Sequence, residues 1–208
     1  IVGIGSGVAG LSVAMELAKR KHRVLVLERS TLASGATSQA AGLIGQMRPT
    51  AEAIRLLTES VRIVRDVEAQ TGMRILEQTG SVRIAQTGDR VVELRKDMDQ
   101  ARKAGLHVES ITQSELRALL PCMRTDDVID ACFCPSDCYL EVPTLAQAYL
   151  TAGRQLGVAF EENAPVQSVR IASGRVAGVT AAGEDYDAPI VVNAAGPWAH
   201  LVADYARQ

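Results

Sequence analysis

The first 28 residues alternate between short apolar runs and a helical stripe. The runs at 1–4 (IVGI) and 23–28 (RVLVLE) have the length and character of buried strands. Between them, apolar side chains at positions 11, 14, 15 and 18 repeat with the spacing of one helix face. Three cationic side chains at 19–21 suit the C-terminal end of that helix. The pattern predicts a strand, a turn, a helix and a second strand.

The middle of the chain mixes helical patterns with short strands. An apolar stripe predicts a helix at 51–70, and further patterns predict helices at 88–104 and 112–120. Thr112 begins the last of these, with an acid three residues later as in a capping box. Apolar runs predict strands at 80–85 and 106–111, and a strand with a turn at Pro135 within 130–142.

The final third returns to alternating helix and strand. We predict a helix over 144–156, begun by a Thr144–Gln147 capping box and ended by Gly157. Strands are predicted at 158–161, 165–171, 175–180 and 189–193, with a turn at 173–174. Residues 194–208 read as a tight turn that leads into a helix. The order of these elements predicts an α/β fold.

Composition and charge argue against two classes of partner. The 208 residues carry a net charge of −2, so we expect no nucleic-acid partner and no anionic membrane surface. No apolar run approaches the roughly 20 residues of a membrane span. There is no signal-peptide pattern, and we expect a cytoplasmic protein.

The four cysteines follow the pattern C-x9-C-x-C-x3-C from Cys122 to Cys138. This spacing matches no familiar zinc or iron–sulfur motif. We therefore expect reduced thiols and no metal site, with a metal site or a redox pair as the alternative.

A glycine-rich turn carries the main chemical motif. Gly5, Gly7 and Gly10 form G-x-G-x-x-G between the first strand and the first helix, and Glu28 follows 18 residues after Gly10. This is the dinucleotide-binding fingerprint, in which the helix N-terminus receives the pyrophosphate and the acid binds ribose hydroxyls. The acid disfavours a 2′-phosphate and so NADP. More than a hundred residues separate it from the next βαβ-like pattern at 144–171, an interruption more typical of FAD than of NAD binding.

Three segments together resemble a known family: IVGIGSGVAGLSVAMELAKRKHRVLVLERS, SGATSQAAGLI and VVNAAGPWA. They resemble the FAD-dependent amine and amino-acid oxidoreductases of the D-amino-acid oxidase superfamily. The resemblance implies a Rossmann-like FAD-binding domain at 1–45 and 143–208, interrupted by a partial α+β substrate domain at 46–142. Members of the family continue for about a further domain. We therefore expect that the C-terminal part of the family fold is missing, as in a fragment or a split enzyme, and that a few residues precede Ile1.

The resemblance also implies the residues that hold FAD. They comprise the glycine turn, the acid and its neighbour, hydroxyl residues near the phosphates, a stretch beside the flavin ring, a strand residue at the adenine and a turn that closes on the cofactor. In this sequence they are Gly5, Gly7, Val8, Ala9, Gly10, Glu28, Arg29, Thr37, Ser38, Gly42, Leu43, Ile44, Val166, Ala195, Gly196 and Trp198. Some relatives attach flavin covalently to a His that Gln39 replaces here, so we expect non-covalent FAD.

Two positions depart from the family pattern. Lys21 stands where the family usually has Gly before the second strand, and a positive φ there would strain the chain. Cys138 replaces a common Gly in a turn.

The implied activity is oxidation of the C–N bond of a small amine or amino acid, such as glycine, sarcosine or a D-amino acid, to an imine. The alternatives are an enzyme like FAD-dependent glycerol-3-phosphate dehydrogenase and a non-catalytic nucleotide-binding fragment or subunit; a partner subunit also stays open. No catalytic residue is assigned. Arg48 could bind a substrate carboxylate, but we favour a solvated side chain before Pro49. Tyr139 is a similar candidate. The histidines at 22, 107 and 200 are scattered and predicted to be structural or at the surface.

Overall fold

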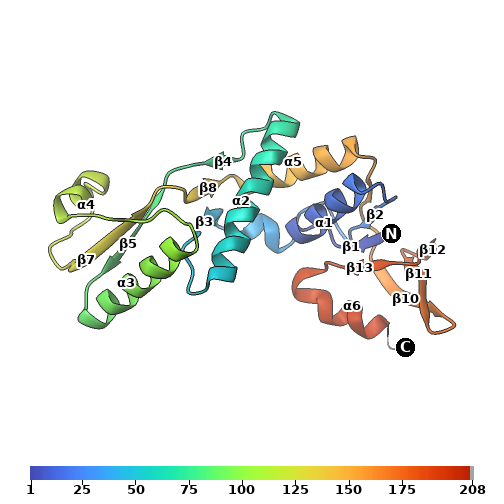
Figure 1. Ribbon diagram of the computed structural model, residues 1–208. Coiled ribbons are helices and arrows are strands. Elements are labelled where there is room, and N and C mark those ends of the chain that lie inside the picture. Colours follow the sequence, from blue (N-terminus) through green and yellow to red (C-terminus); the bar gives the residue numbers. More distant parts are fainter. Residues whose placement is uncertain (207–208) are drawn as a thin grey trace. The chain divides into compact units, whose positions relative to one another are not determined.

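The computed structural model describes residues 1–206, which divide into two compact units (Figure 1). Unit 1 comprises Ile1–Ala41, Val67–Met73 and the chain from Val142 onward. Unit 2 comprises Gly42–Asp66 and Arg74–Glu141. The changes of unit at 41/42 and 141/142 lie near the domain boundaries expected at 45/46 and 142/143. Residues 42–45, however, were expected in the FAD-binding domain and belong to unit 2, whereas residues 67–73 were expected in the substrate domain and belong to unit 1.

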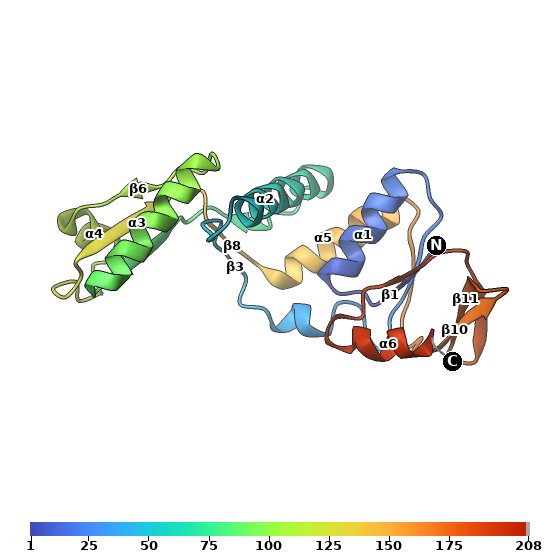
Figure 2. The same ribbon diagram turned by 60° about the horizontal axis from the view of Figure 1, so that its bottom comes forward.

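Unit 1 is built on a four-stranded parallel sheet with the order β13-β1-β2-β9. Its strands are short and apolar: β1 is Val2–Ile4, β2 is Leu25–Leu27, β9 is Ala159–Glu161 and β13 is Val191–Asn193. Helix α1 (Val8–Lys19) joins β1 to β2, and α5 (Val142–Gln155) leads into β9. In Figure 2, α1 and α5 lie above β1 and α6 (Ala199–Tyr205) lies below it. The predicted α/β class is therefore confirmed.

The predicted stripe of α1 is its buried face. Leu11, Ala14, Met15 and Ala18 are all at most 5% exposed, and Met15 is fully buried. Ala14 and Ala18 belong to one buried cluster with Val26 of β2 and with Val24 and Val158, which immediately precede β2 and β9. Burying one side chain as large as Leu or Met contributes about 2 kcal/mol. This packing holds the start of α1 beside the end of β1.

Helix α1 ends in a Schellman motif with a lysine at the left-handed position. The Lys21 amide donates to the Ala18 carbonyl at 2.9 Å, and the His22 amide donates to the Leu17 carbonyl at 3.1 Å. Lys21 has a φ of 68°. The strain expected from the missing glycine is therefore present, since a Cβ in this region costs roughly 1–2 kcal/mol.

Helix α5 begins two residues earlier than predicted. Its first residue is Val142, with Pro143 in the first turn, where the missing amide costs nothing. Thr144 therefore lies inside the helix and is not its N-cap, and the side-chain amide of Gln147 (Nε2) donates to the Thr151 hydroxyl at 3.5 Å. The predicted capping box is wrong. Gly157, with a φ of 84°, does follow the helix end as expected.

An antiparallel sheet completes unit 1. It consists of β10 (Val166–Ala172), β11 (Arg175–Ala181) and β12 (Glu184–Asp187), in that order. The predicted strands at 165–171 and 175–180 are confirmed. Strand β12 has no predicted counterpart, because three of its four residues are acidic and only Tyr186 is partly buried.

Unit 2 holds two small antiparallel sheets and three helices. One sheet has the order β3-β8-β4 and the other β5-β7-β6. Its strands are β3 (Leu43–Ile44), β4 (Leu76–Glu77), β5 (Ser81–Ala85), β6 (Glu109–Ser110), β7 (Asp130–Cys134) and β8 (Cys138–Leu140). The helices are α2 (Ala51–Thr71, whose last turn belongs to unit 1), α3 (Gly88–Lys103) and α4 (Gln113–Leu119). All three were predicted, and the Thr112–Glu115 capping box of α4 is confirmed.

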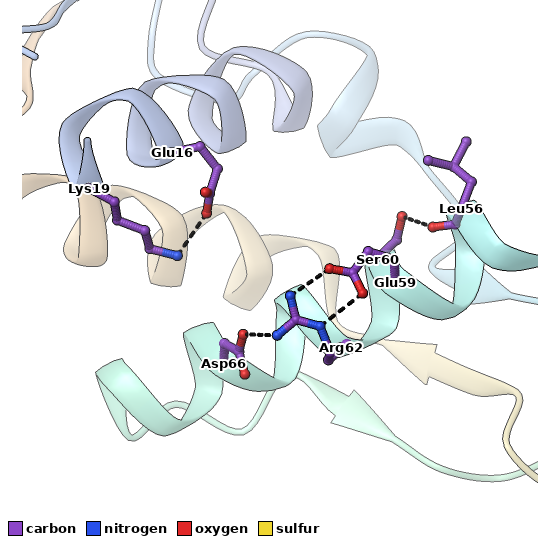
Figure 3. A network of polar contacts seen from close by, with 7 residues as sticks. All are labelled: Glu16, Lys19, Leu56, Glu59, Ser60, Arg62 and Asp66. Carbon is purple, nitrogen blue, oxygen red and sulfur yellow. Dashed lines mark hydrogen bonds and ion pairs between the residues drawn. The ribbon is translucent and has the colours of Figure 1, made fainter.

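The exposed face of α2 carries a network of ion pairs (Figure 3). The Arg62 guanidinium binds Glu59 one turn before it and Asp66 one turn after it, at 2.5 and 2.7 Å. The hydrogen bond from Arg62 lowers the pKa of the Glu59 carboxyl. Spacings of three and four residues bring such side chains together on one helix face. This solvated network accounts for the polar side of the predicted amphipathic helix.

None of the helices described in residues 1–206 combines the length and apolar character needed to cross a membrane.

Candidate cofactor-binding site

A pocket of about 620 Å³ opens at the carboxyl ends of the parallel strands of unit 1. Gly5 follows β1 there, Glu28 follows β2, and Ala194 follows β13. Ligands of open parallel sheets bind at this edge, outside the carboxyl ends of the strands. The pocket is therefore where a dinucleotide is expected.

Two glycines give the turn after β1 its shape. Gly5 has a φ of 99°, and a Cβ on it would lie 2.6 Å from the Ala194 carbonyl oxygen. A Cβ on Gly10 would lie 2.0 Å from the Gly5 carbonyl oxygen. Both carbonyl oxygens belong to the backbone, so neither can shift to make room for a Cβ without distorting the chain. Gly10 itself is buried and does not line the pocket; its role is to let α1 approach β1.

The N-terminus of α1 faces the pocket through Gly7, Val8 and Ala9. Gly7 is the N-cap and has no side chain to satisfy the first amides, and the first turn contains no acid. The first amides of a helix have no intrahelical carbonyl to bind, and the helix dipole is positive there. The arrangement suits an anionic group such as a diphosphate.

The small-residue segment after β2 returns to this helix end. Residues Ala36–Gln39 form a short 3-10 helix, and the Val8 amide donates to Thr37 Oγ1 at 2.9 Å. Ser34, Gly35 and Gln39 also line the pocket. Small side chains leave space there that bulky ones would fill.

Glu28 is anchored by a residue that the motif does not specify. Ser6 is fully buried, and both its amide and its hydroxyl donate to Glu28 Oε2, at 2.9 and 2.7 Å. The Ser30 amide donates to the other oxygen, Oε1, at 3.2 Å. Glu28 is partly buried and lines the pocket. Sequence reasoning missed Ser6 because it occupies a variable position of G-x-G-x-x-G.

The loop after Glu28 is tied down through its backbone amides. The Leu32 amide donates to Glu162 Oε1 at 2.7 Å, and the Ala33 amide donates to Ser6 Oγ at 2.9 Å. Ala33 has a φ of 59°, an uncommon conformation for a residue with a Cβ. These bonds hold a strained loop at one side of the pocket.

Arg29 and Trp198 form a stacked pair in the pocket lining. The guanidinium carbon of Arg29 lies 3.7 Å from the centre of the Trp198 ring, within the range of a cation–π interaction. The turn that carries Trp198 is held by Asn193, whose amide group donates to the Ala199 carbonyl and accepts from the Ala195 amide. A planar apolar ring and a cation are thus presented together.

The remaining wall of the pocket is largely apolar. Ala164, Pro165 and Val166 contribute from the segment before and at the start of β10, and Leu201, Val202 and Tyr205 contribute from α6. The Ala164 amide donates to the Glu28 carbonyl at 2.8 Å, which joins this wall to the end of β2. None of these residues except Val166 was predicted for the site, because their proximity depends on the return of distant segments.

The structure brings most of the predicted cofactor residues into one pocket. Those lining it are Gly5, Gly7, Val8, Ala9, Glu28, Arg29, Thr37, Val166, Ala195, Gly196 and Trp198. Ser38 is not among the lining residues; its hydroxyl donates to the carbonyls of Ser34 and Gly35. The stretch expected beside the flavin ring, Gly42 to Ile44, belongs to unit 2.

The other candidates form no reactive cluster. Burial raises the pKa of the Cys132 thiol to about 11, and it also raises the pKa of Cys134, so both thiols stay protonated near neutral pH. Among residues 1–206, no three His, Cys, Asp or Glu side chains are placed to hold a metal ion. Arg48 donates to the adjacent Met47 carbonyl, and the Tyr139 hydroxyl donates to Glu141. No catalytic residue follows from these contacts.

Known proteins resemble this chain over nearly its full length. A mouse pyruvate dehydrogenase phosphatase regulatory subunit, mitochondrial, is 29% identical over 96% of the chain, and a human sarcosine dehydrogenase, mitochondrial, is 31% identical over 99%. The chain spans 23% of the length of each. The solved structure of L-proline dehydrogenase from P. horikoshii matches 98% of the chain with a TM-score of 0.94 and 26% identity, and the chain spans 54% of it.

The family match covers residues 1–208 and carries the description "FAD dependent oxidoreductase". It agrees with the pocket, the glycine turn and Glu28 on the class of ligand. The resemblance to D-amino-acid oxidase relatives is thereby confirmed, and this chain belongs to the DAO family of FAD-dependent oxidoreductases.

Proposed function

We propose that this chain forms the part of an FAD-dependent oxidoreductase that holds the AMP half of the cofactor, and that the enzyme oxidises the C–N bond of a small amine or amino acid. FAD is the cofactor of the family. The observation that carries the proposal is a single pocket in which the N-terminus of α1 and the carboxylate of Glu28 are both presented.

The pocket fits the AMP half of FAD in three respects. The N-terminus of α1 suits a diphosphate, because its first turn contains no acid and the helix dipole is positive there. Glu28 suits the ribose hydroxyls, because a carboxylate only accepts hydrogen bonds and hydroxyls donate them. Arg29 and Trp198 offer a flat surface that suits a purine ring.

When bound, FAD supplies the acceptor for two electrons from the carbon beside the substrate nitrogen. The residues of this chain bind and orient that cofactor. The substrate loses a proton from nitrogen and a hydride equivalent from carbon, and the product is an imine that water hydrolyses. Sarcosine dehydrogenase and L-proline dehydrogenase are named for small amino acids, and we extend that substrate class to this protein.

Gln39 supports non-covalent attachment of the cofactor. It lines the pocket, and a neutral amide is not a nucleophile that forms a bond to flavin. We expect acid precipitation of the purified protein to leave the yellow chromophore in the supernatant. Flavin that stays in the washed pellet would show a covalent bond.

A second candidate is a flavin-binding subunit without oxidase or dehydrogenase activity. The resemblance to a regulatory subunit over 96% of the chain favours it. The two candidates share the pocket and differ in turnover, so a binding measurement does not separate them.

Anaerobic reduction separates the two candidates. The purified protein with bound FAD is mixed without oxygen with glycine, sarcosine, proline or D-amino acids, and its absorbance is recorded between about 350 and 500 nm. The proposal predicts that one of these substrates bleaches the band near 450 nm. A protein that holds FAD but is bleached by none of them, although dithionite bleaches it, favours the subunit.

A further inference from the structure

Ser6 contacts both Glu28 and the loop beyond it. Its hydroxyl donates to Glu28 Oε2 at 2.7 Å and accepts from the Ala33 amide at 2.9 Å. It is fully buried, so water cannot replace either partner. The bond to Ala33 leaves the hydroxyl proton directed at the carboxylate, because the hydroxyl has one proton and it cannot point at a donor.

The two oxygens of Glu28 are held unequally. Oε2 accepts two bonds from Ser6, at 2.7 and 2.9 Å, whereas Oε1 accepts one longer bond of 3.2 Å from the Ser30 amide. Since Glu28 lines the pocket, Oε1 is the oxygen with the greater unused capacity to accept hydrogen bonds from a ligand. Without the Ser6 hydroxyl, the carboxylate would keep the backbone bonds from Ser6 and Ser30 and would be less restrained about its last torsion, which is broad.

We propose that Ser6 is a positioning residue for ribose recognition: its hydroxyl occupies Glu28 Oε2 and so orients Oε1 for the ribose hydroxyls of the AMP half. The inference rests on the proposed function, in which a ribose binds at Glu28. Ser6 does not contact the ligand in this arrangement, since it is buried and does not line the pocket.

The hydroxyl of Ser6 also sets the position of the loop. Ala33 is 9% exposed and has a positive φ, and its amide is satisfied by Ser6. A buried amide without a partner is costly, so removal of the hydroxyl shifts both the loop and the carboxylate. The experiment therefore needs a measurement that separates the ribose from the rest of the ligand.

Nucleotide pairs provide that measurement. The affinities of the full chain for ADP and for 2′,3′-dideoxy-ADP are measured by calorimetry for the wild type, Ser6→Ala and the control Ser12→Ala. Ser12 lies in α1, six residues after Ser6, and its hydroxyl donates to the Ala9 carbonyl of the same helix, away from Glu28. We expect Ser6→Ala to weaken ADP binding about tenfold, the loss typical of one charge-assisted hydrogen bond, and to change dideoxy-ADP less than twofold. Ser12→Ala should leave both affinities unchanged.

A Ser6→Ala variant that weakens both nucleotides equally would overturn the inference, because Ser6 would then act on the pocket as a whole. Unchanged ADP binding would overturn it as well. If Ser6→Ala does not fold, Ser6→Cys takes its place, since it conserves volume while its thiol is a weak donor; the same selective loss is expected. A wild type that binds neither ADP nor FAD would contradict the proposed function and is thereby distinguished from a failure of Ser6 alone.

Discussion

At the scale of single residues, the site depends on the missing side chain of Gly10 and on the hydrogen bond between Ser6 and Glu28. Gly10 has room for hydrogen only, because the Gly5 carbonyl lies where its Cβ would be. Glu28 is held by Ser6, which lies 22 residues before it in the sequence. The glycine follows from the motif, whereas the serine does not, because a hydrogen bond between distant residues depends on how the chain folds.

Gly10→Ala should destabilise the fold by about 2 kcal/mol. Alanine gains about 1 kcal/mol in helix propensity, but overpacking against backbone costs about 3 kcal/mol. The free energy of unfolding in urea measures the difference. Gly88→Ala is the matched control, because Gly88 is also in the first turn of a helix and a Cβ there meets nothing within 4 Å. The control should be neutral or stabilising; an equal loss in both variants would contradict the packing argument.

At the scale of elements, the apolar pattern predicted the helices better than the strands. The stripe of α1 and the capping box of α4 were read correctly because periodicity and capping are local. Strand β12 and the two-residue strands β3 and β4 were not predicted, since they are too short or too polar to show a period. Helix α5 begins two residues before its predicted start, because a Thr and a Gln at capping-box spacing indicate a start after Pro143.

Lys21→Gly should stabilise the protein by about 0.5–1 kcal/mol. The variant relieves roughly 1–2 kcal/mol of left-handed strain and loses up to about 1 kcal/mol through greater freedom of the unfolded chain. Thermal and urea unfolding test the change. Arg20→Gly, at the preceding residue with a φ of −84°, carries the same entropic loss without the relief and should destabilise. Destabilisation by Lys21→Gly would contradict the strain.

A side-chain hydrogen bond between Tyr186 on β12 and Glu161 on β9 makes stability sensitive to high pH. The Tyr186 hydroxyl donates to Glu161 at 2.6 Å, and this hydrogen bond raises the pKa of Tyr186 to about 12, from 10. Its contribution to folding is complete below pH 10 and is lost as pH rises from 10 to 12, because the unfolded chain then ionises first.

Tyr186→Phe should remove that part of the pH dependence. The free energy of unfolding is compared with that of wild type at intervals from pH 8 to 12, and the difference between the two proteins should shrink above pH 10. A difference in unfolding free energy that stays constant through this range would show that the hydrogen bond does not raise the pKa of Tyr186.

At the scale of the whole chain, the α/β class and the family were readable from sequence because the fingerprint spans strand, turn, helix and acid. The walls of the pocket were not, since residues near 164 and 201 reach Glu28 only through the order of the strands. The flavin-side stretch at 42–44 lies in unit 2, so its predicted role beside the ring stays a prediction.

The central claim is that unit 1 binds FAD through its AMP half, and Trp198 reports on it directly. It is the only tryptophan among the 208 residues and lines the pocket. The measurement is a titration of the chain with FAD, with Trp198 fluorescence as the signal and Trp198→Phe as the blank. We predict saturable quenching with one site per chain, reversed by ADP and not reproduced by FMN, which lacks the AMP half. Quenching by FMN as strong as by FAD, or no reversal by ADP, would contradict the account.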